Sequence, residues 1–201
     1  FMIEVTWCSQ RALWHLMFSG VFERNPSLQF FNTETGTEWL PDTLEKLDSF
    51  YERMKFGKYG SETIFGGMAV EQLSLKPSEY WQRQCHIGAS FLRPTEAHLC
   101  KEIGIEKIMW GSDYPHTEGS YPYTREHLRL TFADFSEDEA TQILTNNAAR
   151  LYKFDVETLK PLAKKVCPTK AEVSTPINYS EIAEDAKGCP GMNPLNQVQK
   201  V

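Results

Sequence analysis

The sequence lacks the cysteine pattern of a disulfide-bonded or zinc-knuckle protein. Its five cysteines are odd in number and form no Cys-x-x-Cys pair, which favours reduced thiols and a cytoplasmic location. It also lacks any apolar run near the roughly 18 residues that a membrane-spanning helix needs. Residues 1–4 contain neither the basic nor the long apolar part of a secretion signal. We therefore expect a soluble protein with no membrane partner.

Basic charge and nucleotide-binding motifs are also scarce. The chain carries 27 acidic against 21 basic residues, a net charge of −6, and no Lys or Arg cluster longer than Lys164-Lys165. Such a chain is not expected to bind nucleic acid. No Walker loop, dinucleotide fingerprint or Gly-x-Ser-x-Gly elbow occurs, which argues against nucleotide-driven and serine-hydrolase chemistry.

The 201 residues are 41% hydrophobic and 12% aromatic, which is enough for one domain with a core. Apolar spacing and capping signals predict a sequence of helices and short strands. The expected helices are 11–21, 41–54, 79–85, 95–103 and 136–150, and the expected strands are 28–31, 86–91 and 105–110. Glycine-rich residues 55–78 predict a long irregular connection, a kind of loop that is often functional.

The alternation of helices and strands predicts a parallel α/β fold. Three strands do not close a barrel, and a complete (β/α)8 barrel takes about 250 residues. The chain is therefore expected to be part of something larger or to form a smaller open sheet. Residues 155–201 hold five of the 11 prolines and predict an extended C-terminal tail.

The most informative segment is Ile108–His116. A parallel strand delivers its last residues to the C-terminal mouth of the sheet, where active sites of such folds gather. Asp113 follows the strand after Gly111, so its carboxylate is placed to bind a divalent metal and to accept a proton. The alternative is that Asp113 only organises the turn before Pro115.

Three segments of the chain together resemble one known family. Trp110–His116 is similar to the last-strand motif of the amidohydrolase-related family of metal-dependent hydrolases and decarboxylases. Asn147–Tyr152 resembles that family's closing helix, and Ser19–Pro26 resembles its approach to the sixth strand. The resemblance runs from about Leu16 to Phe154. It implies that residues 1–154 are the C-terminal portion of a TIM-type (β/α)8 barrel, about strands 6–8, and that 155–201 are a tail.

By this resemblance Asp113 matches the metal-binding Asp at the end of the eighth strand. The family's first-strand His-x-His pair and fifth-strand ligand would lie before residue 1, and no His-x-His occurs in the chain. One carboxylate does not hold a catalytic ion, since such sites use three or four protein ligands. We expect this chain alone to be inactive and to need a missing N-terminal half-barrel or a partner chain. Zn²⁺ is the expected metal, with Mn²⁺ or Fe²⁺ compatible, and the intact protein is expected to be a homo-oligomer.

Four further residues are candidates for the site. Glu34 stands where many family members carry the His of a His-x-Gly turn, so it is either a proton-transfer residue or a solvated carboxylate beside Gly36. His116 is either a partner of a substrate carboxylate or proton shuttle, or a loop-stabilising residue. Tyr121 and Tyr123 follow on the same loop and are candidates for substrate contacts.

Three functions remain open at this point. The first is a metal-dependent hydrolase that uses activated water on the carbonyl of a small molecule, for which a carboxylic acid is one candidate. The second is a non-oxidative decarboxylase of an aromatic or unsaturated acid on the same barrel. The third is a truncated, non-catalytic binding domain.

Overall fold

The computed structural model describes every residue except 1, 91, 188, 190–191 and 193–201. Its architecture is mixed α/β, as predicted, with helices and a small parallel sheet. The sheet has the order β1 (Phe30–Thr33), β2 (Cys85–Ser90), β3 (Ile108–Gly111). Internal contacts divide the chain into two compact units, Phe1–Ile87 and Gly88–Val201, and each is described by itself below. Phe91, the last residue of the predicted second strand, lies outside the described residues.

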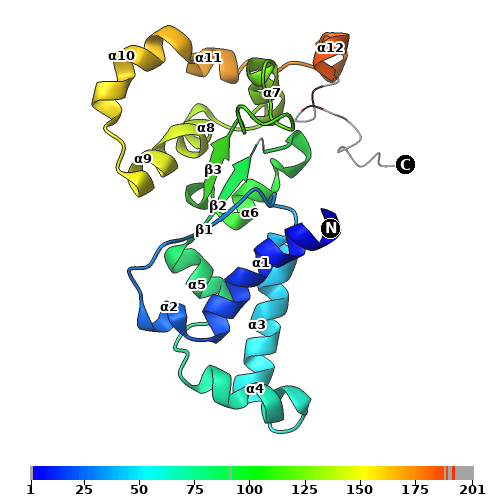
Figure 1. Cartoon of the computed structure of the whole chain (residues 1–201), viewed down its shortest axis with the longest axis vertical. Coiled ribbons are helices and arrows are strands. Elements are labelled where there is room, and N and C mark those ends of the chain that lie inside the picture. Colours follow the sequence, from blue (N-terminus) through cyan, green and yellow to red (C-terminus); the bar gives the residue numbers. More distant parts are fainter. Residues whose placement is uncertain (1, 91, 188, 190–191, 193–201) are drawn as a thin grey trace. The chain divides into compact units, whose positions relative to one another are not determined.

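The first unit is built mainly from helices (Figure 1). They are α1 (Met2–Phe18), α2 (Val21–Arg24), α3 (Leu40–Phe56), α4 (Ser61–Glu71) and α5 (Pro77–Gln84). Its core contains the fully buried side chains of Leu13, Met17, Phe22, Tyr80 and Trp81. The helix predicted from residue 11 begins nine residues earlier, and the one predicted over 41–54 is confirmed with α3.

The prediction of an irregular connection over residues 55–78 is wrong, because the helix α4 occupies the centre of this segment. The glycines that indicated a loop serve a helix–helix contact instead. A Cβ on Gly66 would lie 2.6 Å from the sulfur of Met54, and one on Gly67 would lie 3.5 Å from the Met54 carbonyl oxygen. Glycine lets the α4 backbone approach α3 closely, and local sequence alone does not reveal such a contact.

A buried tyrosine and a carboxylate connect α2 and α5 within the first unit. The fully buried Tyr80 donates its hydroxyl proton to Glu23, and the Ser74 N–H donates to the same carboxylate at 3.2 Å. These hydrogen bonds, that of Tyr80 first, lower the pKa of Glu23 from its ordinary value of 4.5. Burial, and then the bond to Glu23, raise the pKa of Tyr80 to about 12, so the hydroxyl remains a donor through the neutral range.

The second unit carries β3 and the remaining helices (Figure 1). These are η1 (Pro94–Glu96), α6 (Leu99–Ile103), η2 (Ile105–Lys107), α7 (Thr124–Thr131), α8 (Glu137–Thr141), the π-helical turn η3 (Gln142–Asn146), α9 (Asn147–Tyr152), α10 (Val156–Val166), α11 (Lys170–Val173), η4 (Tyr179–Glu181) and α12 (Glu184–Lys187). Leu92, Ile108, Phe132 and Ile143 are fully buried and form part of its core.

Several local predictions for this unit can be compared with the structure. The Ser136–Glu139 capping box is confirmed, with the Glu139 N–H donating to Ser136 Oγ at 3.2 Å. Thr95 does not begin a long helix, because a short 3₁₀ turn, η1, occupies its place and α6 starts only at Leu99. Residues 105–107 form the turn η2 rather than the start of a strand, so β3 is shorter than predicted.

The C-terminal residues differ from the extended tail that their prolines predicted. Within the described part of residues 155–192, α10, α11 and α12 and the turn η4 are helical. Asp155 and Thr169 start α10 and α11 as side-chain caps, accepting from the N–H groups of Thr158 and Glu172. These polar caps start helices in a segment whose prolines predicted extended chain. No helix among the described residues of the chain is both long and apolar enough to cross a membrane.

Asn147 supports the start of the strand that leads to Asp113. Its side chain is fully buried, and its amide nitrogen donates to the carbonyl oxygens of Ile105 and Ile108, each at 2.7 Å. Its amide oxygen accepts from Gln142 Nε2 at 2.6 Å. The first helical residue of α9 therefore adds a buried side-chain donor to the Ile105 carbonyl, which also accepts from the Ile108 N–H, and to the Ile108 carbonyl.

We expect Asn147→Ala to lower the free energy of unfolding by about 1–3 kcal/mol, because it removes a buried amide that donates to two carbonyl oxygens and accepts from Gln142. Urea unfolding followed by circular dichroism measures this value. Asn146→Ala is the matched control, since the Asn146 side chain is exposed and donates to the Gln142 side chain at 3.2 Å rather than to β3 or η2. Equal losses in the two variants would contradict the structural role of Asn147.

We expect Tyr80→Phe to lower the free energy of unfolding by about 1 kcal/mol at pH 7. A carboxyl with a depressed folded pKa stabilises the fold above its unfolded value of 4.5, and this contribution disappears as the pH falls through the folded value. The difference between Tyr80→Phe and wild type should therefore shrink below pH 4.5 in urea titrations. Tyr59→Phe, at a residue 94% exposed, is the control. A difference that stays constant from pH 7 to pH 3 would refute the link to Glu23.

Candidate functional site

Asp113 lies directly after β3 in an unusual backbone conformation. Ile108 and Met109 are buried and anchor the strand, and the chain then turns so that Asp113 has φ 61°. A left-handed conformation is uncommon for residues other than glycine, although Asp tolerates it, and such residues concentrate at functional sites. The Asp113 side chain is 18% exposed. Its carboxylate is thus held by a defined turn and still reaches solvent.

The loop from Ser112 to Ser120 is closed by its own backbone hydrogen bonds. The Ser120 N–H donates to the Ser112 carbonyl at 3.0 Å, and the His116 N–H donates to the Asp113 carbonyl at 2.7 Å. The Gly119 N–H donates to the His116 carbonyl at 3.2 Å. A loop with its backbone groups paired in this way holds its side chains in fixed directions.

Gly119 is the point at which this loop touches itself. A Cβ built there would lie 2.5 Å from the carbonyl oxygen of Ser112, and 3.2 Å from those of Asp113 and His116. All three are backbone atoms that the loop's hydrogen bonds hold in place. Only glycine fits this position without a shift of the residues around Asp113.

His116 and Asp113 form a hydrogen-bonded pair. His116 Nδ1 lies 3.0 Å from Asp113 Oδ2, and the imidazole is 61% exposed. An ionised carboxylate only accepts, so the pair requires the proton on Nδ1, and Nε2 of the neutral ring is then an acceptor. The two residues expected to act at this site are therefore in direct contact.

The tyrosines of the same loop have different surroundings. Tyr121 is 64% exposed, and its ring meets that of Tyr114 edge to face, with 5.1 Å between centroids. The Tyr123 hydroxyl instead donates to the carboxylate of Asp185, far along the chain. That hydrogen bond is the main cause of a raised pKa of Tyr123. Tyr121 is thus open to a ligand, whereas the hydroxyl of Tyr123 is engaged with the C-terminal segment.

Trp110 was not among the site residues predicted from the sequence. Its indole N–H is buried and has no hydrogen-bond partner among the described residues. Its ring centroid lies 6.1 Å from that of His127. An unsatisfied donor three residues before Asp113 costs free energy in the free protein. The only sequence signal was its place at the end of the strand.

Glu34 belongs to the first unit of the chain, whereas Asp113 and His116 belong to the second. It follows β1 directly, is exposed, and has φ 59°, close to the value for Asp113. Beside it, Asn32 Nδ2 and Thr35 Oγ1 are buried without a partner among the described residues. The end of β1 therefore shares two features with the end of β3: a left-handed acidic residue and unsatisfied polar atoms.

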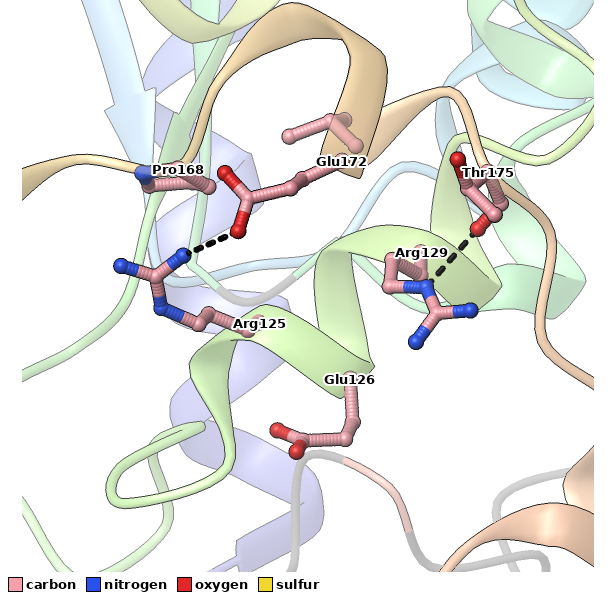
Figure 2. Close-up of a pocket in the computed structure, with 7 residues that line it drawn as sticks. Arg125, Glu126, Arg129, Pro168, Glu172 and Thr175 are labelled. Carbon is pink, nitrogen blue, oxygen red and sulfur yellow. Dashed lines mark hydrogen bonds and ion pairs between the residues drawn. The ribbon is translucent and has the colours of Figure 1, made fainter.

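A hollow of about 350 Å³ lies between α7 and α11, and Asp113 is not among the residues that line it (Figure 2). Two arginines line it, but both are occupied. Arg125 Nη1 pairs with Glu172 Oε1 at 3.0 Å, and Arg129 Nε donates to the Thr175 carbonyl at 2.8 Å. The hollow is where the C-terminal segment meets α7, and its cations are not free for an anionic substrate.

The residues around Asp113 fit a divalent cation only in part. A partly exposed carboxylate after a strand is a suitable oxygen ligand. Within the part of the chain that the structure describes, however, no three His, Cys, Asp or Glu side chains gather closely enough to hold a metal ion. The assignment of Asp113 as a metal ligand stays a prediction from the family resemblance.

A comparison with known families finds a match over most of the chain. The family model described as Amidohydrolase matches residues 8–154, which include Glu34, Asp113 and His116 and end before α10. A comparison with curated proteins finds no match.

We expect Gly119→Ala to destabilise the protein by about 1–3 kcal/mol, because the new methyl group overlaps the Ser112 carbonyl oxygen. Gly111→Ala is a matched control on the same connection, since a Cβ at Gly111 meets nothing within 4 Å. Its effect should stay within about 0.5 kcal/mol. Urea midpoints of the two variants measure the difference, and equal values would show that the close approach is not a constraint.

Proposed function

Because the chain belongs to the amidohydrolase family, as its match over residues 8–154 shows, we propose that the protein is a metal-dependent hydrolase in which Asp113 is a metal ligand and proton acceptor. The family is one of metal-dependent hydrolases and decarboxylases that typically use divalent metals. We further propose that residues 1–154 are the C-terminal portion of a (β/α)8 barrel and that 155–201 form a separate C-terminal segment.

The observation that carries this proposal is the geometry of Asp113. It follows a parallel strand, as catalytic residues of such barrels do. It is left-handed at φ 61°, it stays 18% exposed, and it is held by His116 at 3.0 Å. A turn-organising Asp would bond local backbone amides, whereas Asp113 Oδ2 is bonded by an imidazole.

Asp113 would hold the cation, and Zn²⁺ is our expectation, with Mn²⁺ or Fe²⁺ suited to the same donors. When bound, a divalent cation supplies Lewis-acid chemistry: it polarises a carbonyl oxygen and makes water more acidic. We propose that the other ligands come from outside residues 1–201, either from another part of the same protein or from a partner chain, since a single carboxylate is not enough.

The roles of the chain's own side chains follow from their contacts. Asp113 accepts a proton from the attacking water and returns it to the leaving group. His116 donates from Nδ1, which fixes the direction of the carboxylate, and its exposed Nε2 exchanges a proton with solvent. Tyr121 is a candidate contact for a small-molecule substrate such as a carboxylic acid. Glu34 is proposed as a second proton-transfer residue, because it adopts after β1 the conformation that Asp113 adopts after β3.

We expect Asp113→Asn in the intact protein to lower Zn²⁺ affinity by on the order of 100-fold or more, since even residues behind the metal ligands contribute 10–100-fold. Competition with a chromophoric chelator measures this value. Asn keeps the shape and tolerates the left-handed backbone, so loss of folding does not confound the result. Glu118→Gln is the matched control, because Glu118 is an exposed carboxylate on the same loop. Equal Zn²⁺ binding in the two variants would remove Asp113 as a ligand.

Product analysis with the wild-type protein distinguishes hydrolysis from decarboxylation. Release of a new acid with an alcohol or amine, abolished by Asp113→Asn, would support the proposal. Release of carbon dioxide from a carboxylated aromatic, abolished by the same variant, would replace hydrolysis with decarboxylation. Protein that binds no divalent metal and shows neither activity after Zn²⁺, Mn²⁺ or Fe²⁺ is added would favour a non-catalytic binding role.

A further inference from the structure

The C-terminal segment beyond the family match returns to α7 within the second unit. Three polar contacts fix it there: Arg125 pairs with Glu172, and Arg129 donates to the carbonyl oxygens of Thr175 and Pro176 at 2.8 and 3.2 Å. Figure 2 shows both arginines reaching from α7 toward this segment. Two arginines one helical turn apart therefore bind the incoming chain at successive points.

An apolar cluster continues the contact toward the C-terminus. Ile182, Ala186, Cys189 and Met192 are buried together, and Tyr123, Leu130, Ile177 and Tyr179 pack against them. Two members of this cluster come from elsewhere: Tyr123 from the connection between β3 and α7 (residues 112–123, called the Asp113 loop below) and Leu130 from α7. Side chains buried at one interface in this way resist separation, because separation would expose their apolar surface to water.

Two hydrogen bonds join the segment to the Asp113 loop itself. The Tyr123 hydroxyl donates to Asp185, and the buried Cys189 Sγ donates to the Gly119 carbonyl at 3.1 Å. Sγ also lies 4.0 Å from the Tyr121 carbonyl. The C-terminal segment thus bonds the last part of the loop at two points: the side chain of Tyr123 and the backbone of Gly119.

The position of Gly119 transmits this contact to Asp113. Gly119 lies against the carbonyl oxygens of Ser112 and Asp113, so closely that a methyl group does not fit. The next residue, Ser120, donates to Ser112. Close-packed backbone segments move together rather than independently. A displacement of Gly119 must therefore displace the backbone that carries the Asp113 carboxylate.

We propose that residues 169–187 together with Cys189 are a positioning element for the Asp113 loop, with Asp185 and Cys189 as its positioning residues. The segment holds Gly119 and Tyr123, and Gly119 in turn fixes the direction of the Asp113 carboxylate. The inference rests on the proposed function only where it concerns the binding of a metal by Asp113. The mechanical part, that the C-terminal segment holds the loop, is independent of it.

Hydrogen–deuterium exchange in the intact protein tests the mechanical part. The double variant Asp185→Ala, Cys189→Ala removes both bonds to the loop. The amides of His116, Gly119 and Ser120 should then exchange about tenfold faster, while those of β2 and α9 keep their rates. Glu184→Ala is the control on the same helix, since Glu184 is exposed and pairs with Lys187. Unchanged loop exchange, or equal acceleration everywhere, would overturn the inference.

Zn²⁺ affinity tests the consequence at Asp113. We expect the double alanine variant to raise the Zn²⁺ dissociation constant about tenfold. Asp185→Asn with Cys189→Ser keeps an acceptor and a donor in the same places, so it should restore affinity to within about twofold of wild type. An alanine variant with a loosened loop but wild-type affinity would overturn the positioning role. If Asp113→Asn also leaves the affinity unchanged, the proposed function fails, and the exchange rates alone decide whether the segment holds the loop.

Discussion

The hydrogen bond from the Ser120 N–H to the Ser112 carbonyl is the constraint on which the candidate site depends. It closes the loop after β3 and brings Gly119 against the backbone of Ser112 and Asp113. Within that closed loop His116 meets Asp113, and Asp113 keeps a left-handed backbone. If the loop opened, the pairing of the imidazole with the carboxylate would be lost, and the carboxylate would have no fixed direction.

Two supports from different parts of the chain act on this loop. Asn147 holds the start of β3 through the carbonyl oxygens of Ile105 and Ile108. At the other end, the C-terminal segment bonds Gly119 and Tyr123. The first support lies within the family match and the second beyond it. A strand anchored at its start and a loop held at its end leave the residues between them little freedom.

The features that the sequence predicted well are those with local causes. The Ser136–Glu139 box and the helix predicted over 41–54 depend on residues a few positions apart, and the strand before Asp113 is a short apolar run, although it begins at Ile108 rather than at residue 105. The features that it missed depend on distant residues. Gly66 packs on Met54, and Arg125 and Arg129 bind the C-terminal segment. The left-handed backbone of Glu34 has no sequence signal either, since Glu is not typical of that conformation.

The left-handed backbone at Asp113 also limits which amino acids this position accepts over evolutionary time. Glycine, Asn and Asp adopt φ near 60° readily, whereas a β-branched residue there is strained regardless of its chemistry. A lineage that lost the need for a metal would therefore drift first toward Asn or Gly at this position. If relatives keep Asp rather than Asn or Gly at this position, selection acts on the carboxylate itself. If they carry Val or Ile there, the backbone of the loop has already changed its conformation.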